Sequence, residues 1–403
     1  MSPASGPGLV GTVPDDDTLI SDYRPGTTLL AGPCRTVLTE GTRAVLTDPA
    51  GDGGLPARVH ALLRAQDGPL IVGAVPFEDS ERTMLRVPEH VRWAPARTAA
   101  PTGAGRGAPM PAPARVRALP KPARYRAMVR DALAAIDGGA IDKVVLARSL
   151  AVEYDDDIDP VRVLDALHRG DPTGYLFAVD LEPDADTAGL APRTLAGASP
   201  ELLVSRDGDR VTANPLAGTA PRHPDPDTDA QVARTLLVSP KDRHEHALVV
   251  DAVARALEPF CSHLDVPAEP ELTSTSRLWH LSTHVTGTLA DPDDPESSAL
   301  GLGLALHPTP AVCGAPRAAA HDLISRIEPT ARGFYAGLLG WGDLDGNGEW
   351  VVALRCGELA GKRARVHAGA GIVAGSSPDA ELAETRAKLG TILAALGVDG
   401  VDR

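Results

Sequence analysis

The sequence predicts a mixed α+β fold, and two patterns carry that prediction. Short apolar runs typical of β-strands follow one another without a helix between each pair, which argues against a doubly wound parallel sheet. Amphipathic segments typical of helices also occur, most of them after residue 120. No segment repeats at a fixed period, so a repeat architecture is not indicated.

The predicted elements follow from local patterns. Strand-like runs lie at 70–75, 143–148, 176–179, 202–204, 350–354 and 365–367. Helices are predicted near 228–237, 240–257, 317–325 and 379–396. One more, after the segment that ends at 120, ends at Gly138-Gly139 and has one apolar face, formed by Tyr125, Met128, Val129, Ala132 and Ile136. The segment Ser239-Pro240-Lys241-Asp242 combines a capping serine with proline at the first helical position, so we expect a helix to begin at 240.

Composition limits the classes of protein. The 403 residues are 43% hydrophobic, which suits a large globular protein with a substantial core. The net charge of −15 argues against a nucleic-acid or membrane-surface binder, so an anionic substrate would need local cations. The four cysteines lack CxxC spacing, and no signal peptide or run of 18 apolar residues is apparent. We therefore expect a cytoplasmic protein that binds no membrane.

One segment interrupts the pattern of elements. Residues 94–120 are rich in Ala, Pro, Gly and Arg, a composition that predicts a mobile loop and not a packed element.

Two glutamates lie on or beside apolar helix stripes, where an unpaired carboxylate would be costly to bury. Glu245 falls on the stripe of the helix from 240, and Glu384 flanks the stripe of the helix from 379. If both faced one pocket, a hard divalent cation would be the simplest way to keep them there. Taken singly, each is better explained by an ion pair, Glu245 with a neighbour such as Arg243 and Glu384 with Lys388.

Further features suit ligand binding but are weak alone. Gly369 and Gly371 would let a ligand approach the backbone, although a bulge or tight turn explains them equally well, as it does the PLAGT segment at 215–219. Arg355 could bind a carboxylate in bidentate fashion or form a strand-end salt bridge. Lys143 opens a strand, and only burial beside other cations would make it a usable base. Glu201 alone would be an ordinary turn residue before a strand.

Taken together and in order, these motifs resemble the chorismate-utilising enzymes, a family that includes isochorismate, salicylate, anthranilate and aminodeoxychorismate synthases. The resemblance is clearest from about 120 to 396 and looser before that, through TTLLAGPCRTVLTEG (27–41) and IVGAVPFED (71–79). It is closest to siderophore-type isochorismate synthases. It rests on KVVLARSL (143–150), AGASPELLVSR (196–206), PLAGTAPR (215–222), KDRHEH (241–246), WHLSTHVTG (279–287), LHPTPAVCGAP (306–316), EPTARGFYAG (328–337), VALRC (352–356), GAGIV (369–373) and ELAETRAK (381–388).

The resemblance implies one α+β domain over 1–403, with two stacked, mainly antiparallel sheets flanked by helices. Residues 1–93 would form the N-terminal part of the sheets and 121–398 the chorismate-binding core. It also implies a Mg²⁺-dependent reaction on chorismate in a cleft between the sheets. Glu245 and Glu384 would bind the ion, with Glu381 nearby through water, and the ion would bind the ring carboxylate of chorismate.

The same resemblance assigns the remaining site residues. Lys143 would remove a proton from water that attacks C2, and Glu201 would protonate the departing C4 hydroxyl. Glu201 must be protonated for this, and a partly desolvated setting would raise its pKa. The substrate-binding residues would be Gly218, Thr219, His280, Tyr335, Arg355, Gly369, Gly371 and Lys388, of which Arg355, Tyr335 and the amides of Gly369 and Gly371 would hold the enolpyruvyl carboxylate.

The resemblance also discriminates among members of the family. Anthranilate synthases generally carry Gln where this chain has Lys143, and aminodeoxychorismate synthases use a lysine nucleophile where it has Ala217. We therefore expect an isochorismate synthase with no glutamine amidotransferase partner, acting as a monomer. The alternative is a salicylate synthase, which would go on to eliminate pyruvate; the LHPTPAVCGAP motif favours the isochorismate type.

Overall fold

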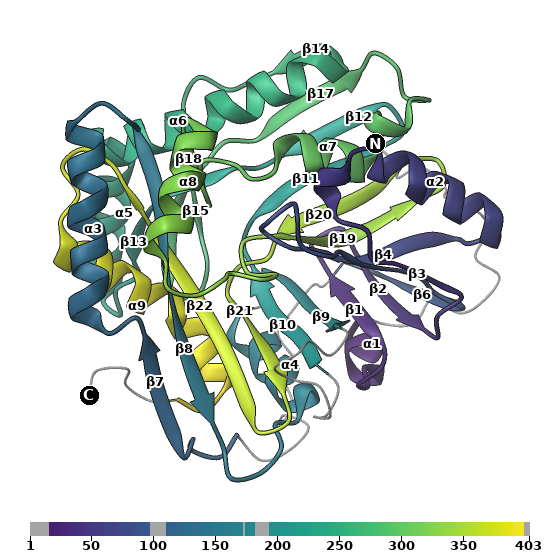
Figure 1. The fold of residues 1–403 in the computed structure, drawn as a ribbon, viewed down its shortest axis with the longest axis horizontal. Coiled ribbons are helices and arrows are strands. Elements are labelled where there is room, and N and C mark those ends of the chain that lie inside the picture. Colours follow the sequence, from purple (N-terminus) through teal and green to yellow (C-terminus); the bar gives the residue numbers. More distant parts are fainter. Residues whose placement is uncertain (1–15, 97–109, 172–173, 182–192, 399–403) are drawn as a thin grey trace.

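Two large antiparallel sheets form the centre of the protein (Figure 1). The computed structural model describes residues 16–96, 110–171, 174–181 and 193–398. The ten-stranded first sheet has, in spatial order, β18 (Gly314–Ala315), β8 (Lys143–Glu153), β22 (Arg363–Ile372), β21 (Cys356–Ala360), β10 (Arg193–Ser199), β9 (Tyr175–Leu181), β1 (Thr28–Ala31), β2 (Arg35–Glu40) and β6 (His90–Pro95), with β7 (Arg115–Leu119) also pairing with β8.

The second sheet has nine strands, and a third sheet has three. The order in the second is β14 (Cys261–Asp265), β17 (Val285–Leu289), β12 (Arg210–Ala213), β11 (Leu202–Asp207), β20 (Gly348–Val352), β19 (Leu338–Asp343), β4 (Leu70–Val75), β5 (Met84–Val87) and β3 (Ala44–Leu46). The third is β13 (Leu216–Pro221), β16 (Leu278–Ser282) and β15 (Glu271–Ser274).

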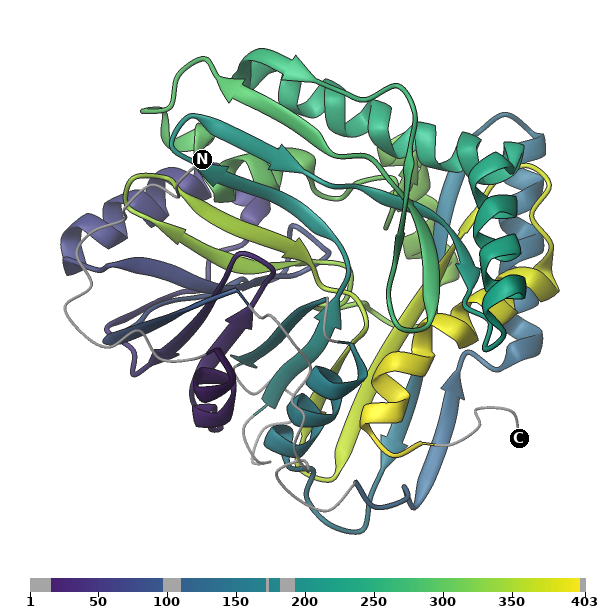
Figure 2. The same cartoon turned by 180° about the vertical axis from the view of Figure 1, so that it is seen from behind.

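Helices cover the outer faces of the sheets. In the view from behind, α9 (Pro378–Ala395) lies across the first sheet, where it contacts β22, α3 (Pro122–Asp137) and α4 (Pro160–Gly170) (Figure 2). The third sheet packs against α5 (Pro226–Val238) and α6 (Pro240–Leu257). The other helices are α1 (Asp16–Asp22), α2 (Leu55–Gln66), α7 (Ala299–Leu306), α8 (Arg317–Ile327) and the short η1 (Ala50–Asp52), η2 (Glu258–Phe260) and η3 (Pro295–Ser297). Among the described residues, no helix has the length and apolar character needed to cross a membrane.

One apolar interior joins both parts of the chain. A single cluster of buried side chains includes Leu30 and Val75 from the N-terminal part and Val144, Trp350 and Leu382 from the rest. Fully burying each such side chain contributes roughly 1.5–3 kcal/mol. The N-terminal strands therefore complete the same core as the later ones, in keeping with the expected α+β fold.

Most predicted elements are confirmed. The helix predicted over 240–257 is α6, and Oγ of Ser239 accepts a hydrogen bond from the amide of Asp242 at 3.3 Å, as the capping pattern predicts. The strand predicted at 350–354 ends earlier, at Val352. The sequence did not predict α2, α4, α7 or the third sheet.

The prediction of a loop over 94–120 is wrong at both ends. Residues 94 and 95 close β6, and Arg115–Leu119 form β7 and pair with β8. Residues 97–109 lie outside the described part of the chain. Composition cannot reveal that β8 offers an unpaired edge on which a polar segment of suitable length can add a strand.

Two of the places where the chain crosses between the large sheets are adjacent. Pro200 and Glu201 carry it from β10 to β11, and residues 353–355 carry it back from β20 to β21. These crossings are bonded to each other, since Oγ of Ser199 donates to the carbonyl of Val352 at 2.6 Å and the amide of Val352 donates to the carbonyl of Glu201 at 3.1 Å. The positions of residues 201 and 355 are thus coupled through the backbone.

Left-handed backbone occurs beside one of these crossings. Arg355 has φ of 51° and Ala336 has φ of 63°. The amide of Ala336 donates to the carbonyl of Ala353 at 2.9 Å, and the amide of Ala353 donates to the carbonyl of Gly337 at 2.8 Å. A residue with a Cβ in this conformation costs of order 1–3 kcal/mol, and such strain is common at functional sites.

This strain predicts opposite effects of glycine at two neighbouring alanines. Ala336→Gly should leave the free energy of unfolding unchanged or raise it by up to ~1 kcal/mol, because glycine adopts a positive φ freely. Ala353→Gly, the control, should lower it by roughly 0.5–1 kcal/mol, because Ala353 is buried and has no left-handed φ to relieve. Urea denaturation measures both; an equal loss in the two variants would contradict the strain.

Candidate active site

A cleft opens where the sheet crossings meet the third sheet and α6. It holds about 530 Å³ of space, part of it open to solvent. Its lining brings together residues from β8, β13, β16, β22, α6, α9 and both crossings. Most predicted site residues are among them, namely Glu201, Gly218, Thr219, Glu245, His280, Tyr335, Arg355, Gly369, Gly371 and Lys388.

The remaining predicted residues, Lys143, Glu381 and Glu384, are not part of this lining. Two of these three side chains contact a residue that lines the cleft. Lys143 is paired with Glu245, and Glu384 is paired with Lys388. Glu381 is paired with Lys241, on the first turn of α6. Lys143 and Glu384 are therefore each tied to the cleft lining by an ion pair, whereas the ion pair of Glu381 is with a residue outside the lining.

A buried ion pair joins β8 to α6. Nζ of Lys143, which is fully buried, lies 2.9 Å from Oε1 of Glu245. Burial alone would raise the pKa of Glu245, but Lys143, and more weakly Lys388 and Lys241, outweigh it, so the net shift is downward. Pairing of Glu245 with Arg243 is wrong, because Arg243 lies 2.6 Å from Glu269 instead.

Glycine at 371 is what allows Glu245 to approach β22. A Cβ built on Gly371 would collide with Oε1 of Glu245 and would lie 3.1 Å from Cε of Lys143. The glycines of the GAGIV motif lie within β22, at positions opposite Val145 and Ala147 of β8, and form no separate turn. Gly371 thus allows a carboxylate to pack closely against the backbone, whereas a Cβ on Gly369 would lie 2.9 Å from Val145.

The carboxylates of α9 also have lysine partners. Nζ of Lys388 lies 2.6 Å from Oε1 of Glu384, so the i,i+4 pair is present, although Lys388 also donates to the carbonyl of Gly369 at 3.2 Å. Nζ of Lys241 donates to Oε1 of Glu381 at 3.1 Å, whereas Oε2 of Glu381 is buried and has no hydrogen-bond partner within the described ranges. Burial and then Glu384 raise the pKa of Glu381, against the effect of Lys241.

The donor chemistry of these three carboxylates fits Mg²⁺. Burial lowers the pKa of Lys241, but Glu381, Glu245 and Glu384 all act on this lysine and raise it above its ordinary value. Carboxylates that all act on one lysine, with Oε2 of Glu381 unsatisfied among the described residues, have the oxygen chemistry of a hard cation that keeps some of its waters. Within the described ranges no group of three or more His, Cys, Asp or Glu side chains forms a ready-made metal cage. In the structure each of the three carboxylates is instead paired with a lysine, Glu245 with Lys143, Glu384 with Lys388 and Glu381 with Lys241.

Glu201 is a buried acid on the first crossing. Only 3% of its surface is exposed. Burial raises its pKa to about 7, although a hydrogen bond from the backbone of Leu216 and the charges of Arg355 and Lys143 act in the opposite direction. Near neutral pH, Glu201 can therefore carry a proton and donate it inside the cleft.

The other polar residues of the lining suit an anionic ligand. Nε of Arg355 and Nε2 of His280 are buried without a hydrogen-bond partner among the described residues. Nδ1 of His280 lies 3.1 Å from Oγ1 of Thr219, and burial and then Arg355 hold the pKa of His280 well below its usual range. The ring of Tyr335 stacks on His367 with centroids 5.1 Å apart. The unsatisfied guanidinium donor of Arg355 in this lining favours a ligand with carboxylate oxygens.

Several lining residues were not predicted. They are mainly apolar and form walls of the cleft, and His367, which supports Tyr335, was also missed. Ala311 and Val312 belong to the LHPTPAVCGAP motif, so the motif contained a signal for them, whereas Val145 and Leu354 look like ordinary strand residues in the sequence. The apolar lining consists of Val145, Pro200, Leu216, Ala217, Ala311, Val312 and Leu354.

A larger cleft, with about 1000 Å³ of space, lies between α2 and the β19–β20 turn. None of the predicted site residues lines it. The buried Arg206 in its wall donates to the carbonyls of Gly208, Pro292 and Ser297, so this guanidinium is used within the fold. The chemistry described above therefore belongs to the smaller cleft.

Comparisons with known proteins show the family of this chain. A family model described as "Chorismate binding enzyme" matches residues 98–397. The isochorismate synthase DhbC of Bacillus subtilis is 44% identical over 398 residues, covering 95% of this chain and 96% of that protein. The isochorismate synthase EntC of Escherichia coli K12 is 38% identical over 387 residues, covering 93% and 95%.

Solved structures with the same fold also match this chain. A crystal structure of a putative 2,3-dihydroxybenzoate-specific isochorismate synthase, DhbC from Bacillus anthracis, matches with a TM-score of 0.88 and 42% identity, covering 95% of this chain and all of that one. Anthranilate synthase component I from Streptococcus pneumoniae matches with a TM-score of 0.70 at 21% identity, covering 96% of this chain and 95% of that one, and this likeness shows the shared fold.

The burial of Glu201 predicts a pH-dependent effect on stability. A carboxyl whose pKa is raised to about 7 in the folded protein destabilises it as the pH rises from the ordinary value of 4.5 to about 7. Glu201→Gln removes that ionisation, so the variant should exceed wild type in free energy of unfolding by about 1–3 kcal/mol at pH 8. The difference should disappear below pH ~4.5, where both forms are neutral. Urea titrations at the two pH values measure it, and a difference independent of pH would contradict the shift.

Proposed function

Because this chain belongs to the chorismate binding enzyme family, we propose that it is an isochorismate synthase, which adds water at C2 of chorismate and removes the C4 hydroxyl. The observation that carries the proposal is that one cleft combines a buried acid, Glu201, with a buried lysine, Lys143, just behind its surface. The two relatives named as isochorismate synthases, which align with more than nine-tenths of the chain, support the choice of product.

Substrate binding would use the unsatisfied donors of the cleft. Arg355, Tyr335 and the amides of Gly369 and Gly371 would hold the enolpyruvyl carboxylate. His280, with Thr219 fixing its ring, and Gly218 would form the facing wall, and Lys388 would add a positive charge. Mg²⁺, held by Glu245 and Glu384 with Glu381 nearby, would supply Lewis-acid binding of the ring carboxylate.

Two residues would move protons. Lys143 would accept a proton from the attacking water, and Glu201 would give its proton to the departing C4 hydroxyl, which leaves as water. Glu201 suits this role because burial keeps it protonated up to about pH 7. Lys143 can accept a proton only as the neutral amine, so the role of base requires its ion pair with Glu245 to be broken. The Arg355 side of the cleft meanwhile keeps the substrate oriented.

The expectations about partners and pathway are part of this proposal. Ala217 lines the cleft where aminodeoxychorismate synthases carry a lysine nucleophile, which supports water as the nucleophile and the absence of an amidotransferase partner. A relative described as a vibriobactin-specific isochorismate synthase is 39% identical and covers 83% of this chain, in support of a role in siderophore synthesis. We expect the enzyme to act as a cytoplasmic monomer.

A single assay tests the proposed function. The purified protein should convert chorismate to isochorismate with Mg²⁺ and lose that activity when the metal is chelated, with restoration on adding Mg²⁺ back. Chromatography after long incubation separates the alternative, since salicylate and pyruvate as main products would identify a salicylate synthase. Chorismate binding without any product at any Mg²⁺ concentration would exclude both enzymes.

Replacing the proposed base should abolish turnover without unfolding the protein. Lys143→Gln should lower kcat for isochorismate formation by roughly 10²–10⁴-fold, because general base catalysis typically contributes that much. Thermal unfolding checks the fold, and the exposed Lys121→Gln serves as the matched control, with wild-type kcat expected. A folded Lys143→Gln protein with wild-type kcat would refute the role of Lys143.

A further inference from the structure

The outer edge of β8 has a gap in its strand pairing next to the cleft. On the side away from β22, the C-terminal half of β8 pairs with β7, from Ser149 to Glu153. Its N-terminal end pairs with β18, at Lys143 and Val144, and the amide of Val145 donates to the carbonyl of Cys313 at 2.7 Å. No described strand pairs with this edge over residues 146–148.

Two side chains fill this gap. Oε1 of Glu328 accepts a hydrogen bond from the amide of Ala147 at 2.7 Å, and the guanidinium of Arg332 donates to the carbonyl of Val145 at 2.9 Å. Glu328 thus supplies the acceptor, and Arg332 the donor, that the backbone of a neighbouring strand would otherwise supply to β8. Both side chains come from the loop after α8, in the EPTARGFYAG motif.

The two side chains also fix each other. Arg332 donates to both carboxylate oxygens of Glu328, at 2.9 and 2.6 Å, in the two-pronged geometry that makes such pairs strong and directional. The side chains are only 3% and 5% exposed, so neither charge is screened by water. Removing one partner of such a pair leaves a buried charge uncompensated.

The same guanidinium reaches the cleft wall on two sides. It donates to the carbonyl of Val312 at 2.7 Å, and Val312 and Val145 both line the cleft. The carbonyl of Arg332 accepts a hydrogen bond from the amide of Tyr335 at 3.0 Å. Lys143 lies two residues before Val145 on the same strand. The side chain of Arg332 therefore connects the strand of the proposed base to the apolar wall, and its backbone carbonyl holds the segment of Tyr335.

We propose that Glu328 and Arg332 are positioning residues of the reaction site, which set the distance between the β8 strand that carries Lys143 and the walls formed by Val312 and Tyr335. The inference rests on the proposed function. Neither residue lines the cleft, so both act through the backbone atoms that they hold. Displacements on the order of 1 Å in such a frame can lower turnover by about 10²-fold.

Arg332→Lys tests the proposal, with Arg206→Lys as the matched control. Arg206 is likewise buried and also donates to several backbone carbonyls, but it lies in the wall of the other cleft. A lysine keeps the charge in both cases but cannot reach all the former partners. In Arg332→Lys we expect kcat to fall by roughly 10–100-fold with a smaller change in KM, and the alkaline limb of the pH profile to shift. In Arg206→Lys we expect lower stability but wild-type kcat, KM and pH profile.

Glu328→Gln provides an independent variant. Glutamine keeps an acceptor for the amide of Ala147 but loses the ion pair, so its effect on kcat should have the same sign as that of Arg332→Lys and be smaller. Equal losses of stability in Arg332→Lys and Arg206→Lys, with wild-type kinetics and pH profile in both, would overturn the proposal. Failure of both Arg332→Lys and Glu328→Gln to fold would assign the pair to the fold alone and overturn it as well.

A failure of the proposed function can be distinguished from a failure of the positioning role. If the wild-type protein forms no isochorismate, the function is wrong, and the positioning role is then decided by calorimetric binding of chorismate. Weaker binding in Arg332→Lys than in Arg206→Lys would support the positioning role, and equal binding in the two variants would overturn it.

Discussion

The bonds between the two sheet crossings are the constraint on which the cleft depends. Ser199 and Glu201 on one crossing are hydrogen bonded to Val352 on the other, so the acid at 201 and the guanidinium at 355 are held in one rigid frame. Each crossing continues directly into strands of both large sheets, whose shared interior keeps the frame from shifting. A site built on such elements is preorganised, and little reorganisation remains for the moment of reaction.

Several charged side chains at and behind this site occur in pairs of opposite sign. Glu245 is paired with Lys143, Glu384 with Lys388 and Glu381 with Lys241, and behind them Glu328 is paired with Arg332. Removing one partner costs more free energy of folding than the intact pair contributes, because the remaining charge stays desolvated. The members of each pair are therefore constrained together, even where only one of them faces the ligand. The left-handed Arg355 adds a local backbone cost that the surrounding bonds must offset.

Local signals in the sequence predicted local structure well. The cap at Ser239 and the apolar stripe fixed the limits of α6, and the ordered motifs predicted the family and most of the cleft lining. The sequence could not show that Glu245 pairs with Lys143 and not with the nearby Arg243, because that partner is brought in by the register of distant strands. The same reason explains β7, which forms only because β8 offers an edge. Glu328 and Arg332 lay within a recognised motif, but their task depends on a gap in pairing that no local pattern encodes.

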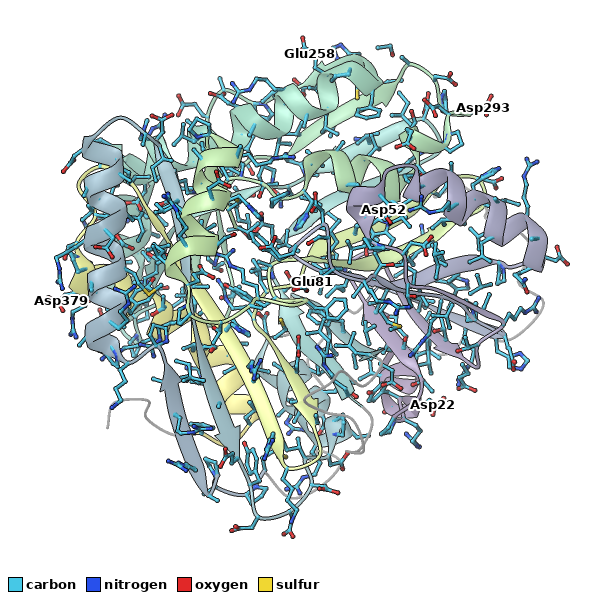
Figure 3. All side chains as sticks on the ribbon, in the orientation of Figure 1. Asp22, Asp52, Glu81, Glu258, Asp293 and Asp379 are labelled. Carbon is cyan, nitrogen blue, oxygen red and sulfur yellow. The ribbon has the colours of Figure 1, made fainter. Side chains whose placement is uncertain are left out.

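The distribution of charge has a consequence for the encounter with a substrate. The chain carries a net charge of −15, and acidic residues such as Asp22, Glu258, Asp293 and Asp379 lie at the periphery in Figure 3. The guanidinium of Arg355 lies in the cleft instead, whereas Lys143 and Lys388 are paired there with Glu245 and Glu384. An anion approaching from solution is therefore repelled at long range and attracted only within a few ångströms of the entrance. Dissolved ions screen the long-range field, with a Debye length of about 8 Å at physiological ionic strength. Moderate salt should therefore speed the association of an anionic substrate, whereas salt slows association when opposite charges attract the partners.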